Sequence, residues 1–431
     1  MSSTPPADTT ESKTIRSRHV GPVAAKSLGK FQRWYTVAAV GLLNSILILL
    51  LLNLVLYAIM RARRPPSPEA PQISFDPERL HKAYPGWRED DVKTLLLETL
   101  REKEYEPFTG FRERPFQGRF VNIDAAGFRV SKGQAPWPPR SDAINVFVFG
   151  GSTAFGASLP DDETIASYLQ ESAAADHASP PLAVYNFARP AYFSSQELIL
   201  FEQLLRLGFV PQVAVFIDGL NEFIFADGQP LFTDRLRNFM AGKSGSSPLD
   251  SVPMVRAAHW LTQRWSKIKP QSPETVNYDD PLLLQGAVDR WMSNKRMIEL
   301  IANGFGVRTV FAWQPVPTYK YDLRYHFFLH SSTEFAAYGR SGYGYPLMEN
   351  LRAGGKLGSN VLWLADMQQD KHDNLYVDSI HYNAAFSKEI AAQIYGFLRN
   401  PSPHAVSGNK RPPQHNELAQ SSRQQVSEGR Q

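Results

Sequence analysis

The stretch that decides the fold is Asn145–Glu171, which reads NVFVFGGSTAFGASLPDDETIASYLQE. It opens with an apolar run that ends at Phe149 and is typical of a buried strand. A turn of small residues follows and holds Ser152, and an amphipathic, helix-like segment comes next. A serine between a strand and a helix either caps the helix or is held out for chemistry, and the remaining sequence must distinguish the two roles.

Four other segments share the character of this first strand. The expected strands are short, apolar and rich in β-branched or aromatic residues, and they are Ile144–Phe149, Ala183–Phe187, Val213–Ile217, Thr309–Trp313 and Val361–Ala365. Helix-like segments separate most of them. This alternation predicts an α/β fold, with a mainly parallel sheet covered by helices on both faces. The connections 223–285 and 317–358 are too long for ordinary links and are predicted to be lids or binding loops.

Composition excludes several classes of protein. The chain of 431 residues has a formal net charge of only +4, and no basic, aromatic-interleaved face indicates nucleic-acid binding. It has no cysteine, which excludes disulfides, thiol catalysis and cysteine-ligated zinc.

Residues Tyr35–Met60 form an uncharged apolar run that is long enough to cross a bilayer. The run is too long for a signal peptide, and YAIMRARRP at its end offers no small-residue cleavage site. The sequence therefore predicts one uncleaved membrane anchor. Basic residues flank it on both sides, so charge barely indicates orientation. With a single anchor and a large C-terminal domain, we favour a periplasmic or extracellular position for that domain.

The sequence divides into five predicted regions. They are a disordered N-terminal tail (1–34), the transmembrane anchor (35–60), a Pro-rich spacer with a small α+β pre-domain (61–142), the large α/β domain (143–400) and a disordered C-terminal tail (401–431). Within the pre-domain, residues 88–102 look helical and residues 116–130 resemble a short hairpin.

Chemistry-bearing residues follow four of the expected strands. In an open parallel sheet, ligands bind beyond the carboxyl ends of the strands. The loops at this edge are GGST (150–153), NFARPAYFSSQE (186–197), IDGLNEF (217–223) and NLYVDSIHYN (374–383). Together they supply a serine, a tight backbone turn, an asparagine and an Asp-His pair, which are the groups that nucleophilic acyl transfer needs.

Each of these residues has a physical role in that reaction. Ser152 needs a base to take its proton, and the imidazole of His381 suits this task. Asp378, three residues earlier, is expected to hold His381 in one tautomer. Oxyanion donors are expected from the Ser152 N–H, from a backbone N–H near Ala191 and from the Asn221 side-chain amide.

These blocks, in this order, resemble the SGNH/GDSL hydrolase family. The resemblance covers residues 143–400 and implies a three-layer α/β/α, flavodoxin-like fold, with ester hydrolysis or acyl transfer that requires no cofactor and no metal. It implies that Ser152, Asp378 and His381 form the catalytic triad and that Asn221 is an oxyanion donor. Gly151 stands where the family usually has Asp, and Ala191 stands where it usually has Gly. A positive φ at Ala191 would strain the turn.

Taken singly, each block has a plainer interpretation. Ser152 or Thr153 could cap a helix, Asp378 and His381 could open a capped helix or form half of a metal site, and Asn221 could be a turn residue. All three blocks after expected strands favour the hydrolase-like site. The other candidates have two interpretations each: His326 and His330 as metal ligands or as packed lid residues, Glu222 as a supporting acceptor or a solvated carboxylate, and Arg189 as an anion ligand or a cover for the sheet edge.

The sequence therefore predicts a membrane-anchored serine hydrolase that cleaves O-acyl esters, with an acetyl group on a surface or secreted glycan as the suggested substrate. The glycan rests on the resemblance and the anchor alone. One alternative is an O-acyltransferase that acts on a surface or secreted polysaccharide. An alternative of another class is a catalytically weak glycan-binding or scaffold protein, for which Ala191 is the chief argument.

Overall fold

The computed structural model describes residues 22–62, 77–177, 180–241, 252–255, 277–329 and 332–399. The predicted C-terminal tail and residues 1–21 of the predicted N-terminal tail lie outside the described residues. The chain forms two compact units, Met1–Pro65 with Gly245–Ser272, and the remainder.

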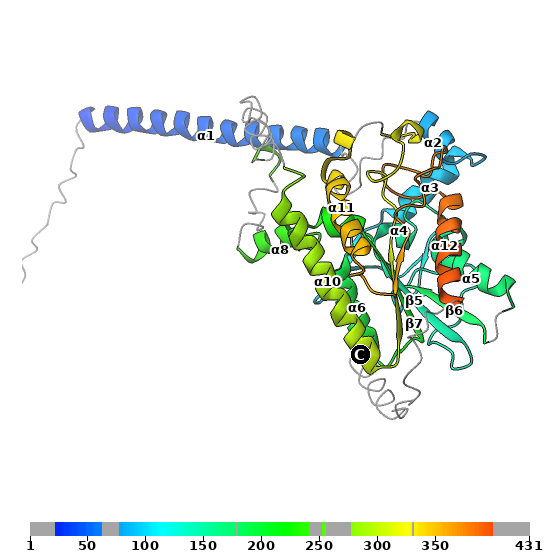
Figure 1. Cartoon of the computed structure of the whole chain (residues 1–431). Coiled ribbons are helices and arrows are strands. Elements are labelled where there is room, and N and C mark those ends of the chain that lie inside the picture. Colours follow the sequence, from blue (N-terminus) through cyan, green and yellow to red (C-terminus); the bar gives the residue numbers. More distant parts are fainter. Residues whose placement is uncertain are drawn as a thin grey trace, which may run out of the picture. The chain divides into compact units, whose positions relative to one another are not determined.

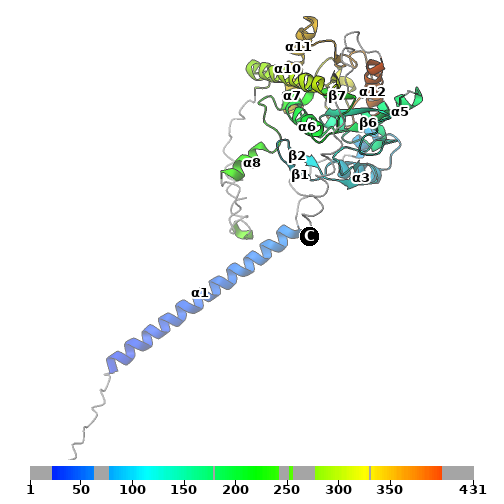
Figure 2. The same cartoon turned by 90° about the horizontal axis from the view of Figure 1, so that it is seen from below.

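The first unit contains α1 (Pro22–Ala62), which Figure 1 and Figure 2 show as one uninterrupted helix. Within it, the 30 residues Lys30–Ile59 are long and apolar enough to span a membrane. Helix α1 begins well before Tyr35, the predicted start of the anchor. A helix of this composition near the N-terminus is shared by anchors and signal sequences, so anchoring remains a prediction.

The second unit is built on a sheet of five parallel strands. The strands are β5 (Ile144–Gly150), β6 (Leu182–Asn186), β7 (Val213–Asp218), β8 (Arg308–Trp313) and β9 (Val361–Trp363). Each lies within two residues of its predicted limits. Their order is β6-β5-β7-β8-β9, so the chain crosses from one side of β5 to the other between β6 and β7. This is the flavodoxin-like order, and it confirms the predicted α/β class.

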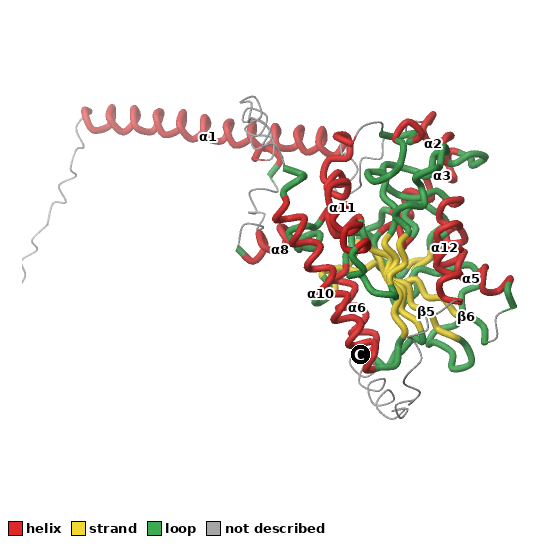
Figure 3. Tube along the Cα trace, viewed as in Figure 1, coloured by secondary structure: helices red, strands yellow, loops and turns green. Residues whose placement is uncertain are grey.

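Helices cover both faces of this sheet and give three layers (Figure 3). Helices α5 (Ile165–Ala175) and α12 (Ala384–Arg399) pack on one face with Val146 and Val148 of β5. The other face, with Phe147 and Phe149, packs against α6 (Ser194–Arg206), α10 (Pro281–Gly304) and α11 (Arg340–Ala353). Alternate side chains of a strand point to opposite faces, so a strand that is apolar throughout is buried on both sides.

The segment before the sheet packs onto the same core. It contains α2 (Pro77–Ala83), α3 (Glu89–Thr99) and two antiparallel pairs, β1 (Lys103–Glu106) with β2 (Gly110–Glu113) and β3 (Phe116–Gln117) with β4 (Asn122–Ile123). Helix α3 and the β3–β4 pair confirm the two elements predicted here, whereas the β1–β2 hairpin was not predicted. Leu95 joins the core on the α5 side of the sheet and Phe128 joins it on the α6 side.

Both long connections contain helices among their described residues. The first contains the end of α7 (Leu220–Ile224) and all of α8 (Thr233–Met240), and the second contains η3 (Leu323–Tyr325), η4 (Ser332–Gly339) and α11. Their role as lids or binding loops stays a prediction, as do the five region boundaries.

Candidate active site

Ser152 lies in the sharp turn between β5 and the short helix α4 (Ser152–Phe155). Gly150 has φ +149°, and a Cβ there would lie 2.6 Å from the Ala154 Cβ and 2.8 Å from the Ile217 carbonyl oxygen. Only glycine fits this position. Gly151 occupies the cap position of α4, and the Ser152 hydroxyl contacts a histidine instead of a backbone N–H. The interpretation of Ser152 as a helix cap is therefore wrong.

The structure brings Ser152, His381 and Asp378 into one hydrogen-bonded chain. His381 Nε2 lies 2.8 Å from Ser152 Oγ, and His381 Nδ1 lies 2.6 Å from Asp378 Oδ2. Burial raises the pKa of the Asp378 carboxyl, but His381 and two backbone N–H donors outweigh it and hold that pKa below its usual value. Asp378 is therefore ionised near neutral pH and can fix the proton of His381 on Nδ1, which leaves Nε2 free to accept from Ser152.

The loop that carries Asp378 and His381 is held at both ends. Tyr376 and Tyr382 form an isolated antiparallel bridge, and both side chains are buried. Inside the loop, Asp378 Oδ1 accepts from the N–H groups of Ile380 (2.9 Å) and His381 (2.8 Å). One carboxylate oxygen thus shapes the loop while the other orients the imidazole.

Asn221 lies beside the Ser152 turn. It follows β7 on helix α7, and its Nδ2 donates to the Tyr192 carbonyl oxygen at 2.6 Å. A Cβ on Gly151 would lie 2.2 Å from Asn221 Nδ2, so the amide packs directly against Gly151. Position 151 therefore requires glycine, because any side chain there would displace Asn221.

Ala191 occupies a tight turn that is joined to the same place. The Tyr192 N–H donates to the Arg189 carbonyl oxygen at 3.1 Å, and the Arg189 N–H donates to the Gly150 carbonyl oxygen at 2.9 Å. Ala191 has φ +66°, as a type II turn requires at its third residue. Gly151, Tyr192 and Asn221 line one small cavity of about 10 Å³. The turns that follow β5, β6 and β7 therefore converge.

We expect Ala191→Gly to stabilise the protein by about 1 kcal/mol, because glycine adopts a positive φ without strain. Turnover should change less than about twofold, since the backbone N–H is kept. Thermal melts and ester hydrolysis measure the two effects. As a matched control, Ala392→Gly in the exposed face of α12 should destabilise by about 1 kcal/mol. An equal loss of stability in Ala191→Gly would mean that packing of the Ala191 methyl group stabilises the protein.

Arg189 and Glu222 have structural roles. Arg189 is buried, is paired with Glu106 and donates to the Tyr192 hydroxyl at 2.8 Å, so it covers the sheet edge. Glu222 is 1% exposed and accepts from the Ser194 N–H at 2.6 Å. The interpretation of Glu222 as a solvated carboxylate is therefore wrong. It joins the helix that carries Asn221 to the start of α6.

His326 is fully buried among aromatic rings. Its ring stacks on Tyr376 with centroids 5.1 Å apart, and its Nδ1 accepts from the N–H groups of Phe328 and Leu329 at 3.1 Å. The packed interpretation of this histidine is confirmed. His330 lies outside the described residues.

A cluster of buried carboxyl groups beneath Asn221 was not predicted from the sequence. Glu197, Asp218 and Glu222 are each 1–4% exposed. Asp218 Oδ2 accepts from the Trp291 indole N–H at 3.0 Å, and Arg290 pairs with Glu222 at 3.4 Å. Burial, followed by the charge of Glu222, raises the pKa of Asp218 to about 7. Burial and the neighbouring carboxylates also raise the pKa of Glu197. The only visible sequence signal is Asp218 itself, an acid that ends an otherwise apolar strand.

This cluster predicts that stability falls as pH rises from 4 to 8. The folded state binds the Asp218 proton more tightly than the unfolded state, in which the carboxyl has the ordinary pKa of 3.8. The folded state loses this proton as the pH passes about 7. The free energy of unfolding should fall by no more than about 4 kcal/mol over the whole range. Asp218→Asn cannot ionise and should remove much of this fall in thermal melts. The exposed control Asp370→Asn should keep it. Parallel wild-type and Asp218→Asn curves would contradict the assignment.

Comparison with known proteins gave matches among solved structures only. No family model matches the chain, and no curated protein matches it. A member of the lipolytic G-D-S-L family from Veillonella parvula matches with 9% identity and TM-score 0.33, covering 60% of this chain and 100% of its own. An acetyl xylan esterase matches with 9% identity and TM-score 0.34, covering 59% and 98%.

A psychrotrophic esterase from a Pseudoalteromonas species matches with 11% identity and TM-score 0.30, covering 59% of this chain and 97% of its own. Identities of 9–11% and TM-scores of 0.30–0.34 are too low to support a function, so the proposed function rests on the geometry around Ser152. The three solved structures described here, to which this chain is similar, are thus two esterases and one lipolytic protein of the G-D-S-L family.

Proposed function

We propose that this protein is a serine hydrolase of SGNH type that cleaves O-acyl esters. The observation that carries the proposal is the chain of contacts from Asp378 through His381 to Ser152, at 2.6 Å and 2.8 Å. These three residues come from two loops far apart in sequence. A serine that neither caps its helix nor bonds to the backbone, but faces an oriented imidazole, has the arrangement of an activated nucleophile.

The reaction proceeds in two steps. His381 Nε2 takes the hydroxyl proton as Ser152 Oγ attacks the ester carbonyl, and the resulting imidazolium is stabilised by the Asp378 carboxylate. The tetrahedral oxyanion receives hydrogen bonds from the Ser152 N–H, the Ala191 N–H and the Asn221 amide. His381 then returns its proton to the departing alcohol, which leaves an acyl-enzyme. Water, activated by His381, attacks that ester, and the carboxylic acid and free Ser152 are released.

The substrate that we propose is an acetyl ester of a glycan, and the setting is a membrane surface outside the cytoplasm. The apolar length of Lys30–Ile59 supports anchoring through α1. An active C-terminal alkaline phosphatase fusion would support this orientation. A fluorescent C-terminal fusion to a fluorescent protein would instead place the domain in the cytoplasm, and the proposed chemistry would be unaffected.

Hydrolysis of p-nitrophenyl acetate by the full-length chain tests the proposed activity. Release of p-nitrophenol that depends on Ser152 supports it, and no release above the buffer rate would indicate a binding or scaffold protein. Adding an oligosaccharide as acceptor separates the two enzymatic fates of the acyl group. Hydrolysis yields free acetate, whereas an acyltransferase would yield the acetylated oligosaccharide.

A further inference from the structure

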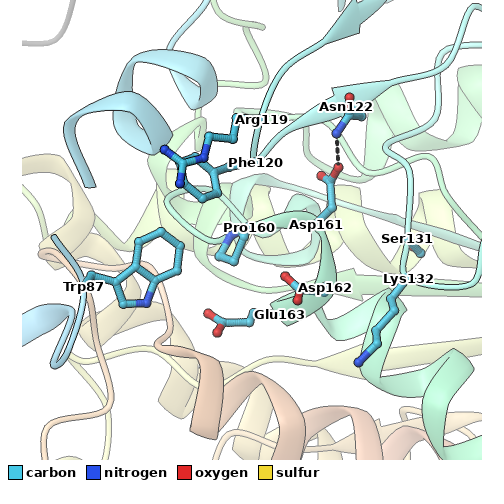
Figure 4. Close-up of a pocket in the computed structure, with 10 residues that line it drawn as sticks. All are labelled: Trp87, Arg119, Phe120, Asn122, Ser131, Lys132, Pro160, Asp161, Asp162 and Glu163. Atoms are coloured by element: carbon cyan, nitrogen blue, oxygen red, sulfur yellow. Dashed lines mark hydrogen bonds between the residues drawn. The ribbon is translucent and has the colours of Figure 1, made fainter. Parts of the chain in front are cut away.

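A second cavity lies between the segment before the sheet and the loop that follows α4. It measures about 450 Å³, which is within the range of small-molecule sites (Figure 4). Three stretches of chain build it: the α2–α3 connection, the β3–β4 hairpin with the loop after it, and the η1 turn (Asp161–Glu163). The residues that line it are Trp87, Arg119, Phe120, Asn122, Ser131, Lys132, Pro160, Asp161, Asp162 and Glu163.

The lining combines aromatic faces with hydrogen-bonding groups. Figure 4 shows Trp87, Phe120 and Pro160 on one side and Asp162, Glu163 and Lys132 around the other. The rings of Trp87 and Phe120 have centroids 5.2 Å apart. A sugar ring presents apolar C–H faces, which pack against aromatic rings, and hydroxyl groups, which bond to carboxylates and ammonium groups. Because the lining carries charges of both signs, it suits a neutral, polyhydroxylated ligand better than an ion.

Hydrogen bonds fix the side of this cavity that Asp161 and Asn122 form. Asp161 accepts from the Asn122 amide at 2.8 Å and from Arg129 Nε at 2.9 Å. The Arg129 guanidinium is buried and donates to the carbonyl oxygens of Phe155 (2.9 Å) and Gly156 (2.6 Å). Since these contacts use Asp161, the ligand-binding carboxylates are Asp162 and Glu163. A preformed cavity loses little entropy on binding.

The same contacts join the cavity to the Ser152 site. Arg129 holds the end of α4, the helix that Ser152 begins. Pro160 follows Ser152 by eight residues, and the first three of these lie in α4, so the two residues are at most about 23 Å apart. The Tyr84 hydroxyl donates at 2.8 Å to the carbonyl oxygen of Ser158, a residue in the segment of chain that joins Ser152 to Pro160. Burial is the main cause that raises the pKa of the Tyr84 hydroxyl, and the negative charges of Asp378 and Glu163 raise it further. An oligosaccharide of a few units spans this distance.

We propose that the cavity lined by Trp87, Phe120, Asp162 and Glu163 binds one sugar unit of an O-acylated oligosaccharide whose acyl group reaches Ser152. This proposal rests on the proposed ester hydrolysis for its second half. The binding half stands on the cavity alone, and the experiment separates the two.

The kinetic test compares two substrates with the full-length chain in lipid nanodiscs, because common detergents carry sugar headgroups. Trp87→Ala should lower kcat/KM for O-acetylated xylotetraose about 10- to 100-fold, mainly through KM. It should leave p-nitrophenyl acetate hydrolysis within about twofold. Trp87→Phe should restore part of the loss, and Glu163→Gln, which keeps the side-chain shape, should also raise KM. Tyr105→Ala removes an exposed aromatic from β1 and should change neither rate.

The binding test needs no catalysis. Calorimetric titration of the Ser152→Ala chain with xylotetraose and with chitotetraose should give binding to at least one, and Trp87→Ala should abolish it. If neither binds while the wild type hydrolyses p-nitrophenyl acetate, the sugar site is wrong and the proposed function stands. If Trp87-dependent binding occurs but p-nitrophenyl acetate is not hydrolysed, the proposed function fails and the sugar site stands. Equal effects of Trp87→Ala on both ester substrates would also overturn the sugar site.

Discussion

Ser152→Ala is expected to lower kcat for p-nitrophenyl acetate by about 10⁴- to 10⁶-fold, with a melting temperature close to that of the wild type. In the proposed mechanism the hydroxyl is the attacking group, so no other residue can form the acyl-enzyme. The fold should be little affected, because Gly151 and not Ser152 occupies the cap position of α4. His381→Ala should cost a similar factor since the hydroxyl then lacks its base, and the double variant should be no worse than either single one.

The relative losses of kcat among these variants test whether Ser152, His381 and Asp378 act as one unit. Asp378→Asn should also lose several orders of magnitude, because the imidazole remains but its tautomer is wrong. Ser172→Ala, which removes a hydroxyl bonded only to the Tyr168 carbonyl on α5, is the control and should retain full turnover. Additive losses in the Ser152, His381 double variant would contradict a shared catalytic unit.

Asn221→Ala is expected to lower kcat by about 10²- to 10³-fold, the usual result of removing one oxyanion donor. KM should change little, since in the proposed mechanism the amide bonds mainly to charge that develops in the transition state. Gly151→Ala should have a comparable effect by another route. Its new Cβ would lie 2.2 Å from Asn221 Nδ2 and would move the amide away from Ser152.

Asn360→Ala is the matched control for the second prediction. Its Nδ2 donates to Glu299 (2.8 Å) and to Thr309 (3.2 Å), and it precedes β9 at the opposite edge of the sheet. It should lose about 1 kcal/mol of stability and keep its turnover. If Asn221→Ala and Asn360→Ala lower stability alike and both keep kcat, Asn221 is only a structural link to Tyr192.

The sheet and the candidate triad could be predicted because both depend on local patterns. Strands buried on two faces must be apolar throughout, so Val213–Ile217 and its counterparts are visible as short apolar runs. The carboxyl ends of parallel strands lie at one edge, so the sequence alone predicts that Ser152, Asn221 and His381 lie near one another. The strain expected of a positive φ at Ala191 applies in the structure, where this residue has φ +66°.

The features that were missed depend on contacts between distant segments. In the sequence, Glu197 and Asp218 look like ordinary acidic residues. Their carboxyl groups are buried only because α6 packs against β7 and Trp291. The β1–β2 hairpin joins KEYE to GFRE, two charged segments with no apolar alternation to mark them as strands. The need for glycine at position 151 is not visible in the sequence, because the side chain that a Cβ would meet belongs to Asn221, 70 positions away.

The central claim is that Ser152 is a nucleophile activated by His381. The most direct test is to treat the full-length chain with a fluorophosphonate and to map the adduct by mass spectrometry. The structure leads us to expect one adduct, on Ser152, that is lost in Ser152→Ala, strongly reduced in His381→Ala and unchanged by EDTA. Labelling that persists in Ser152→Ala, or an unlabelled wild-type protein that is folded, would contradict the claim.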